Sequence, residues 1–239
     1  MTANDIRKII VAIYLEIIGR NEYSQTLRDY CFTKYKDGKY YSDCSSSISY
    51  TYKKAGYGFG ILNTAGMYTS KKFTEVPVKI VAGQITNPEV LRLADLLLYA
   101  GTDNGRPGCV GHVEMIGAIE GSKITLFGHG SGKPKKTLMT TKNTERYNSK
   151  TNTKVGNKGL IKVIRYIQDD DVKPDVPTDG PVVKSGTWNL RQGPGTEYDV
   201  IGGVAGGTHV TLVSVDGWSY IQAGNMSGWI SNKALEVKA

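Results

Sequence analysis

The chain has 239 residues, of which 39% are hydrophobic and 22% charged, so we expect a globular protein with one large domain or two small ones. Its net charge of +8 is uneven: residues 1–168 carry 25 Lys and Arg against 13 Asp and Glu, whereas residues 169–180 carry one Lys and five Asp, and residues 181–239 carry four of each. Three widely spaced cysteines exclude a disulfide framework and a cysteine-rich zinc site. The basic first part indicates a polyanionic partner such as a cell wall, a membrane surface or nucleic acid, or else a basic surface that only aids solubility.

The first predicted element is an amphipathic helix over residues 4–18, with Asn4 as its cap and Gly19 at its end. Isoleucines recur at helical spacing at positions 6, 9, 10, 13 and 17. Glu16 interrupts the apolar stretch, so we expect no signal peptide, and no stretch is long and apolar enough for a membrane span. We therefore expect synthesis in the cytoplasm and no insertion into a membrane.

A second helix is predicted to begin at the cysteine of "YYSDCSSSISY". Ser42 or Asp43 is a good N-cap, the next eleven residues contain no proline or glycine, and Gly56 follows as a C-terminal cap. Cys44 thus lies in the first turn, where the helix dipole and free N–H groups favour a thiolate and could stabilise an oxyanion. A buried, unreactive core thiol is the alternative. A shorter helix is expected within residues 60–72.

The strand signals come later, at 94–100, 111–120, 123–129 and 162–167, with a long polar loop over 130–160. Helices followed by an antiparallel sheet predict an α+β fold. If Gly121 and Ser122 form a two-residue hairpin turn, Glu120 pairs with Lys123. His129 then lies opposite Glu114, on the same face as His112, while the other face buries four residues: Val113, Met115, Ile124 and Leu126.

Two histidines on one face of a sheet have several interpretations. With a cysteine they could bind zinc, or they could be two polar residues on an exposed face. The interpretation that we favour is a nucleophile, Cys44, with a base, His112, and an orienting residue, His129. His209, in "THVTL", is expected to be a half-exposed strand residue.

The segment "QDDDVKPDVPTDGP" predicts an extended acidic linker over residues 169–181, between one domain at 1–168 and another at 182–239. The second domain contains all three tryptophans and has turn signals about every ten residues. This spacing predicts a small all-β barrel or sandwich whose core depends on its tryptophans.

The segment "SDCSSSISYTYKKAGY" resembles the Asp-Cys-Ser helix of the NlpC/P60 cysteine peptidases, and "LADLLLYAG" and "VGHVEMIGAIEG" resemble their Gly-Asp-Leu and Gly-His-Val strands. The chain departs from the pattern at Ser46 and Ala94, where the family has glycine, and in a longer interval between His112 and His129. The resemblance implies a papain-like catalytic domain. The related CHAP amidases share this fold and its cysteine–histidine core. It also implies that Asp43 and Ser45 contact the substrate and that no metal or cofactor is needed.

Residues 188–235, from "WNLRQGPG" to "GWISNKAL", resemble a bacterial SH3 (SH3b) module, which implies binding to peptidoglycan. Within it we assign wall contact to Trp218 and Tyr220, although a core role is the alternative for the tryptophans. Together the resemblances imply an endolysin-like hydrolase of a Gram-positive wall, released from the cytoplasm through a holin. The expected activity is a γ-D-glutamyl-L-diamino acid endopeptidase. The alternatives are an N-acetylmuramoyl-L-alanine amidase and a non-catalytic wall-binding protein.

Overall fold

The computed structural model describes residues 2–81, 84–101, 105–139, 159–169, 181–215, 217–223 and 226–236. The chain divides into two compact units, residues 13–168 and residues 1–12 with 169–239. The helix α1 (Ala3–Leu15) contributes residues to both units. Most of the predicted linker and of the predicted 130–160 loop lies outside the described residues, so the domain bounds stay predictions.

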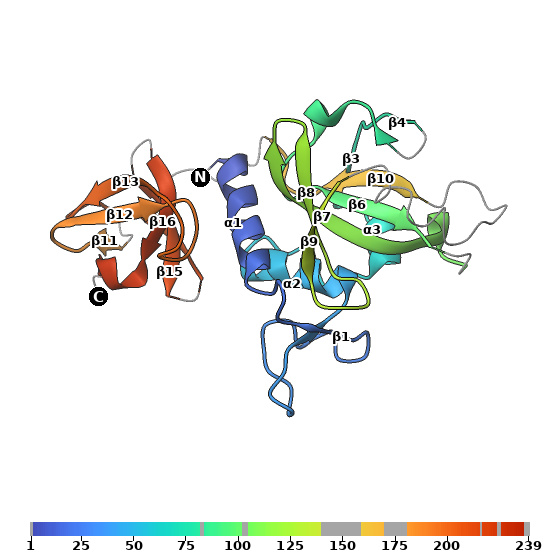
Figure 1. Ribbon diagram of the computed structural model, residues 1–239, viewed down its shortest axis with the longest axis horizontal. Helices are drawn as coiled ribbons and strands as arrows, with labels where there is room; N and C mark the ends of the chain where they lie inside the picture. The colour runs from blue at the N-terminus through green and yellow to red at the C-terminus, as the bar shows by residue number, and fades with distance from the viewer. Residues whose placement is uncertain are drawn as a thin grey trace. The chain divides into compact units, whose positions relative to one another are not determined.

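The larger unit is built on a six-stranded antiparallel sheet with the order β3-β10-β6-β7-β8-β9 (Figure 1). Its strands are β3 (Thr74–Val76), β6 (Leu96–Ala100), β7 (Val110–Glu120), β8 (Lys123–Gly128), β9 (Lys135–Leu138) and β10 (Leu160–Arg165). Two short pairs lie outside it, β1 (Glu22–Tyr23) with β2 (Tyr41–Ser42) and β4 (Ile80–Val81) with β5 (Gln84–Ile85). This mixed helix-and-antiparallel-sheet architecture agrees with the predicted α+β class, and β9 is a strand where we expected a loop.

The helices are α1, α2 (Cys44–Lys54) and α3 (Thr64–Thr69), and both α2 and α3 pack against β7 (Figure 1). The helix predicted from Cys44 is confirmed, including Gly56 with a φ of +80° just beyond its end. Single-turn 3-10 helices occur at Pro88–Val90, Pro107–Cys109 and Asn232–Ala234. No helix among the described residues is long and apolar enough to cross a bilayer.

The predicted bounds of the first helix need correction at both ends. It begins one residue early because Thr2, not Asn4, caps it: the Thr2 hydroxyl accepts the Asp5 N–H, and the Asp5 carboxylate accepts the Thr2 N–H. It ends at Leu15, and turns continue to residue 20. The five predicted isoleucines are fully buried, at positions 6, 9, 10, 13 and 17, so the amphipathic interpretation is confirmed.

The hairpin between β7 and β8 follows the predicted register for only half its length. Glu120 pairs with Lys123 across the two-residue turn as predicted, but a bulge at Gly117 shifts every later pair by one residue. The ring of Phe127 occupies the space where a Cβ on Gly117 would lie, 2.2 Å from the nearest ring atom. Consequently Gly128, and not His129, lies opposite Glu114, and β8 ends there.

The shifted register also redistributes the buried residues between the two faces. Leu126 pairs with Ile116, so it lies on the face of His112 and Glu114 and not on that of Val113. A core cluster covers this face, made of Val76, Leu91, Leu97, Tyr99, Ile116, Ile124, Leu126, Leu160 and Val163. The predicted four-residue set is buried, but it is divided between both faces of the hairpin.

A buried ion pair joins the start of β6 to the end of β10. The Asp95 carboxylate is completely buried and accepts two hydrogen bonds of 2.7 Å from the Arg165 guanidinium and one of 2.8 Å from the Arg92 N–H. Ala94, which precedes it, has a φ of +63°, the left-handed conformation that glycine adopts most easily. The aspartate of the predicted Gly-Asp-Leu strand therefore has a structural role.

We expect Asp95→Ala to lower the free energy of unfolding by about 3 kcal/mol, because it leaves the largely buried Arg165 cation without its carboxylate. Adding Arg165→Met should restore most of the loss. Glu120→Ala, which breaks an exposed pair with Lys123, is the control and should change stability by less than about 0.5 kcal/mol. Urea unfolding followed by circular dichroism measures all three, and equal effects of Asp95→Ala and Glu120→Ala would contradict this account.

The smaller unit contains a five-stranded antiparallel sheet with the order β13-β12-β16-β15-β14 and a separate pair, β11 with β17. The strands are β11 (Val182–Val183), β12 (Thr187–Arg191), β13 (Val200–Ala205), β14 (Thr211–Val215), β15 (Trp218–Ala223), β16 (Met226–Ser231) and β17 (Leu235–Glu236). Its core contains Val183, Leu190, Val204, Val210, Ile221, Ala223, Ile230 and Ala234. Trp229 is buried and Trp188 packs on this core, which confirms the all-β prediction and the structural role of these tryptophans.

Candidate active site

Cys44 is the first residue of α2, and a complete capping box fixes its position. Asp43 accepts the N–H groups of Ser45 and Ser46 at 2.9 and 2.7 Å, and the Ser46 hydroxyl accepts the Asp43 N–H at 2.8 Å. Within the described residues the Cys44 N–H has no hydrogen-bond acceptor, as expected in a first helical turn. The sulfur is thus held rigidly beside a free backbone donor.

The thiol of Cys44 is buried, and burial raises its pKa to about 12. The Asp43 carboxylate adds to this increase, while the backbone N–H groups of Val113 and Ser45 and the Arg28 cation oppose it. We expected the start of the helix to favour the thiolate. The helix N–H groups act in the expected direction, but loss of hydration outweighs them and raises the pKa of the thiol.

His112 lies on β7, directly before the residue whose N–H points at the Cys44 sulfur. Its Nε2 lies 3.7 Å from Oε1 of Glu114, and both side chains are almost completely buried. Glu114 packs over Gly128, where even a single Cβ would lie 2.8 Å from the carboxylate. The sequence analysis missed Glu114 as a site residue, although residues two apart on a strand share one face.

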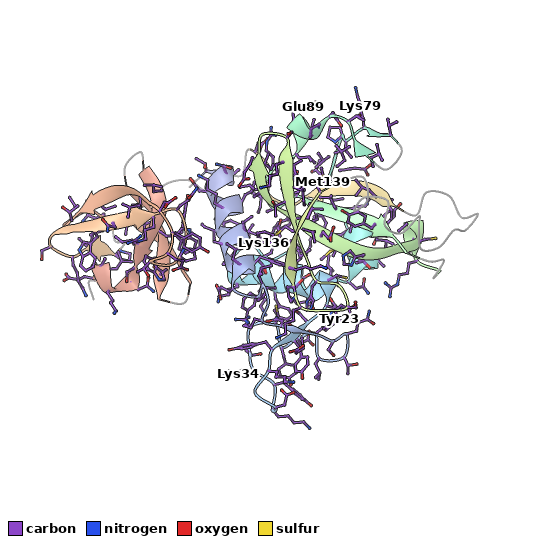
Figure 2. All side chains as sticks on the ribbon, viewed as in Figure 1. Tyr23, Lys34, Lys79, Glu89, Lys136 and Met139 are labelled. Atoms are coloured by element: carbon purple, nitrogen blue, oxygen red, sulfur yellow. The ribbon has the colours of Figure 1, made fainter. Side chains whose placement is uncertain are left out.

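His129 follows β8 and is completely buried. Its Nδ1 is hydrogen-bonded to the Ser42 hydroxyl at 3.0 Å, and the Tyr23 ring packs edge-on against it with ring centroids 5.3 Å apart. Figure 2 labels Tyr23, which lies at the end of β1. The structure therefore places His129 against the segment that precedes Cys44 and places Glu114 beside His112.

Burial lowers the pKa of His129 to about 4 from 6.5, although the Asp43 carboxylate and the Gly132 backbone oppose the decrease. The unfolded chain therefore takes up more protons than the folded one between pH 6.5 and 4, and stability falls as the pH falls through this window. We expect about 2 kcal/mol less stability at pH 5 than at pH 7.5. Urea unfolding followed at 222 nm, where helices dominate the signal, measures it.

The matched variant for this experiment is His129→Phe, which removes the titrating group and leaves Ser42 its hydrogen bond from Asn21. The variant should not show the loss of about 2 kcal/mol in stability that the original chain shows between pH 7.5 and pH 5. If the variant and the original chain lose equal stability on acidification, His129 is not the group responsible.

The two residues predicted to contact substrate both form hydrogen bonds within the N-terminal cap of α2. Asp43 and Ser45 are 4% and 3% exposed, and the Ser45 hydroxyl donates to Oδ1 of Asp43. Arg28, which the sequence analysis did not identify, contacts both of them. Among the described residues, no group of three His, Cys, Asp or Glu side chains is arranged to hold a metal ion.

The smaller unit has a cavity of about 220 Å³ lined by Thr187, Trp188, Asn189, Arg191, Thr196, Trp218 and Ser231. Trp218, predicted to contact the wall, is therefore at a cavity. Tyr220, predicted with it, is buried; its ring packs on Trp229 and its hydroxyl donates to the Asp5 carboxylate at 3.1 Å. His209 is an exposed residue in an isolated β-bridge with Val182.

Residues 185–236 match the family model of the bacterial SH3 domain, which confirms that module. The curated proteins include no match to the sequence. Among solved structures the chain is similar to "The crystal structure of Ly7917", with 12% identity over 97% of this chain and 92% of that one and a TM-score of 0.37. The chain is also similar to "The crystal structure of Ly7917 with the hydrolyzing product of MDP", with 13% identity over 96% of this chain and 92% of that one and a TM-score of 0.39.

A third similar structure is NlpC2 from Trichomonas vaginalis, with 14% identity over 60% of this chain and 44% of that chain and a TM-score of 0.23. All three TM-scores lie below 0.5. The functional assignment therefore rests on the site and on the SH3 domain.

Proposed function

We propose that this chain is a peptidoglycan hydrolase that cleaves an amide bond of the stem peptide, with Cys44 as its nucleophile. One observation carries the proposal: a cysteine at the start of a capped helix lies against the strand that presents a buried histidine–carboxylate pair, His112 and Glu114. A nucleophile, a base and an anion behind the base are the three parts that acyl transfer needs. The bacterial SH3 domain supports a cell-wall substrate.

The chemistry follows from the protonation state of the thiol. Because Cys44 is protonated in the resting site, its proton must leave as its sulfur attacks the amide carbonyl. In the proposal His112 accepts that proton, and Glu114 stabilises the resulting imidazolium. The free N–H of Cys44 holds the developing oxyanion. His112 then protonates the leaving amine, and water hydrolyses the thioester to release the acid and regenerate the thiol.

The role predicted for His129 is refined in this proposal. Because Glu114 lies beside His112, the carboxylate is the group that orients the base. His129 instead supports the segment before Cys44 through Ser42 and Tyr23. The triad that we propose is Cys44, His112 and Glu114, with His129 as a positioning residue.

The bacterial SH3 domain would hold the enzyme at the wall. Linking a wall-binding module to a catalytic one raises the effective concentration of substrate without new contacts at the active site. The cavity that contains Trp218 combines indole rings with hydroxyl and amide groups, which suits a glycan or peptide ligand. The excess of positive charge in residues 1–168 favours an anionic, Gram-positive wall.

Mass spectrometry of digested peptidoglycan tests the proposed function. We expect cleavage after γ-linked D-glutamate, which leaves L-alanyl-γ-D-glutamate on the glycan. A free lactyl group on muramic acid would show an amidase on the same site. Intact muropeptides together with retained wall binding would show a non-catalytic binding protein and would overturn the proposal.

A further inference from the structure

Three polar side chains form a connected cluster around the start of α2, which we call the Arg28–Asp43–Ser45 cluster. Nε of Arg28 lies 3.4 Å from Oδ2 of Asp43, and its Nη2 donates to the Ser45 hydroxyl at 3.1 Å and to the Leu62 carbonyl at 3.2 Å. Asp43 and Ser45 flank Cys44 in the sequence. Arg28 is therefore fixed from two sides next to the proposed nucleophile.

The hydrogen bonds of this cluster are concentrated on Oδ1 of Asp43, the Ser45 hydroxyl and Nη2 of Arg28. Oδ1 of Asp43 accepts the cap N–H groups and the Ser45 hydroxyl, while its Oδ2 faces Arg28. Among the residues that the structure describes, neither Nη1 nor the buried Nε of Arg28 has a hydrogen-bond partner, although Nε makes the ion pair with Asp43. The Arg28 side chain is 23% exposed, whereas that of Asp43 is 5% exposed. The cluster thus presents one immobilised cation with a free donor.

The chemistry of that donor selects an anion. A guanidinium held by two hydrogen bonds from Nη2 and by an ion pair at Nε is pre-organised to hydrogen-bond a carboxylate through Nη1, and such charge-assisted bonds are roughly twice as strong as neutral ones. A γ-linked glutamate carries a free carboxylate on its Cα. Two methylene groups separate that Cα from the carbonyl that Cys44 would attack. A substrate in which that carboxylate is amidated lacks the anion but has the same shape.

We propose that Arg28 forms a carboxylate-binding subsite beside Cys44 that selects substrates with a free α-carboxylate on the γ-linked residue before the cleaved bond. The inference deepens the proposed function and depends on it. It also reassigns the cap residues: Asp43 and Ser45 hold Arg28 in place, and Arg28 contacts the substrate. Asp43 is poorly placed to bind a substrate ammonium because the cap occupies its Oδ1 and the Arg28 cation already faces its Oδ2 at 3.4 Å.

The experiment compares two peptides on two enzymes. The peptides are L-Ala-γ-D-Glu-L-Lys and the same tripeptide with the α-carboxylate amidated, and the enzymes are the full chain and its Arg28→Gln variant. We expect the unchanged chain to prefer the carboxylate peptide by about 10–100-fold in kcat/KM. The variant should lose that preference, mainly by losing activity on the carboxylate peptide. The preference is a ratio measured on one sample, so partial unfolding of the variant does not alter it.

Two further variants complete the design. Lys36→Gln removes one exposed positive charge from the same unit and should leave the preference unchanged. Arg28→Lys keeps the charge but not the planar fork, so it should retain a reduced preference. Equal cleavage of both peptides by the unchanged chain, or an equal loss on both peptides in Arg28→Gln, would overturn the inference and leave the proposed function in place. Cleavage of neither peptide by the unchanged chain would overturn both.

Discussion

Replacing Cys44 by alanine is expected to lower kcat for wall hydrolysis by about 10⁴-fold or more while the chain stays folded. Of the three cysteines only Cys44 is the first residue of an α-helix, and without its sulfur no thioester forms. Asp43 and Ser46 remain to cap α2, so the helix should keep its bounds. Turbidity loss of purified walls gives the rate, and circular dichroism checks the fold.

The other two cysteines provide matched controls for this experiment. Cys31 is buried and burial raises its pKa to about 12, as for Cys44, but its sulfur contacts the Asn21 side chain and lies outside the helix start. Cys109 is half-buried in the turn before β7. Cys109→Ser should retain full activity. Lysis by Cys44→Ala at the unchanged rate would remove Cys44 from the mechanism and point to another nucleophile, whereas wall binding without lysis by the unchanged chain would show a binding protein.

The helix that carries Cys44 could be predicted because all its determinants are local. A capping aspartate, twelve residues without proline or glycine, and Gly56 at the end make up fourteen consecutive positions. The two-residue turn of the β7–β8 hairpin could be predicted for the same reason. The same local rule selected Asn4 as the cap of the first helix, whereas the structure shows Thr2 in that role.

The remaining site residues depend on contacts that are distant in the sequence. Counting residues along a hairpin assumes a regular ladder, and the bulge at Gly117 breaks that assumption halfway. The glycine inside a strand pattern was an available signal for this bulge. Arg28 reaches Asp43 from fifteen positions away, across a polar segment without periodicity, so no pattern in the sequence connects the two.

Burial explains why the predicted thiolate is absent and what the site must supply instead. The cap that positions Cys44 also places the Asp43 carboxylate beside it, and both loss of hydration and this charge raise the pKa of the thiol. At pH 7 such a thiol is almost entirely protonated. Proton transfer to a neighbouring base during the attack is therefore a requirement of the proposed mechanism.

If a neighbouring base must accept the proton of Cys44, replacing that base should reduce activity nearly as much as replacing Cys44. His112→Gln is expected to lower kcat/KM by about 10³–10⁴-fold at pH 7, because glutamine fits the strand but accepts no proton. His209→Gln, at an exposed position in the bacterial SH3 domain, is the matched control and should have no effect on hydrolysis of a soluble tripeptide.

The pH dependence of His112→Gln separates a lost base from a damaged fold. Without its base the site depends on the small fraction of Cys44 that ionises by itself, and this fraction rises tenfold per pH unit below a pKa of about 12. The residual kcat/KM of the variant should therefore increase with a slope close to one on a logarithmic scale between pH 7 and 9. A variant that is merely misfolded would gain nothing from alkali. A flat profile would show that His112 does not accept the proton of Cys44, and the base would then have to be sought elsewhere.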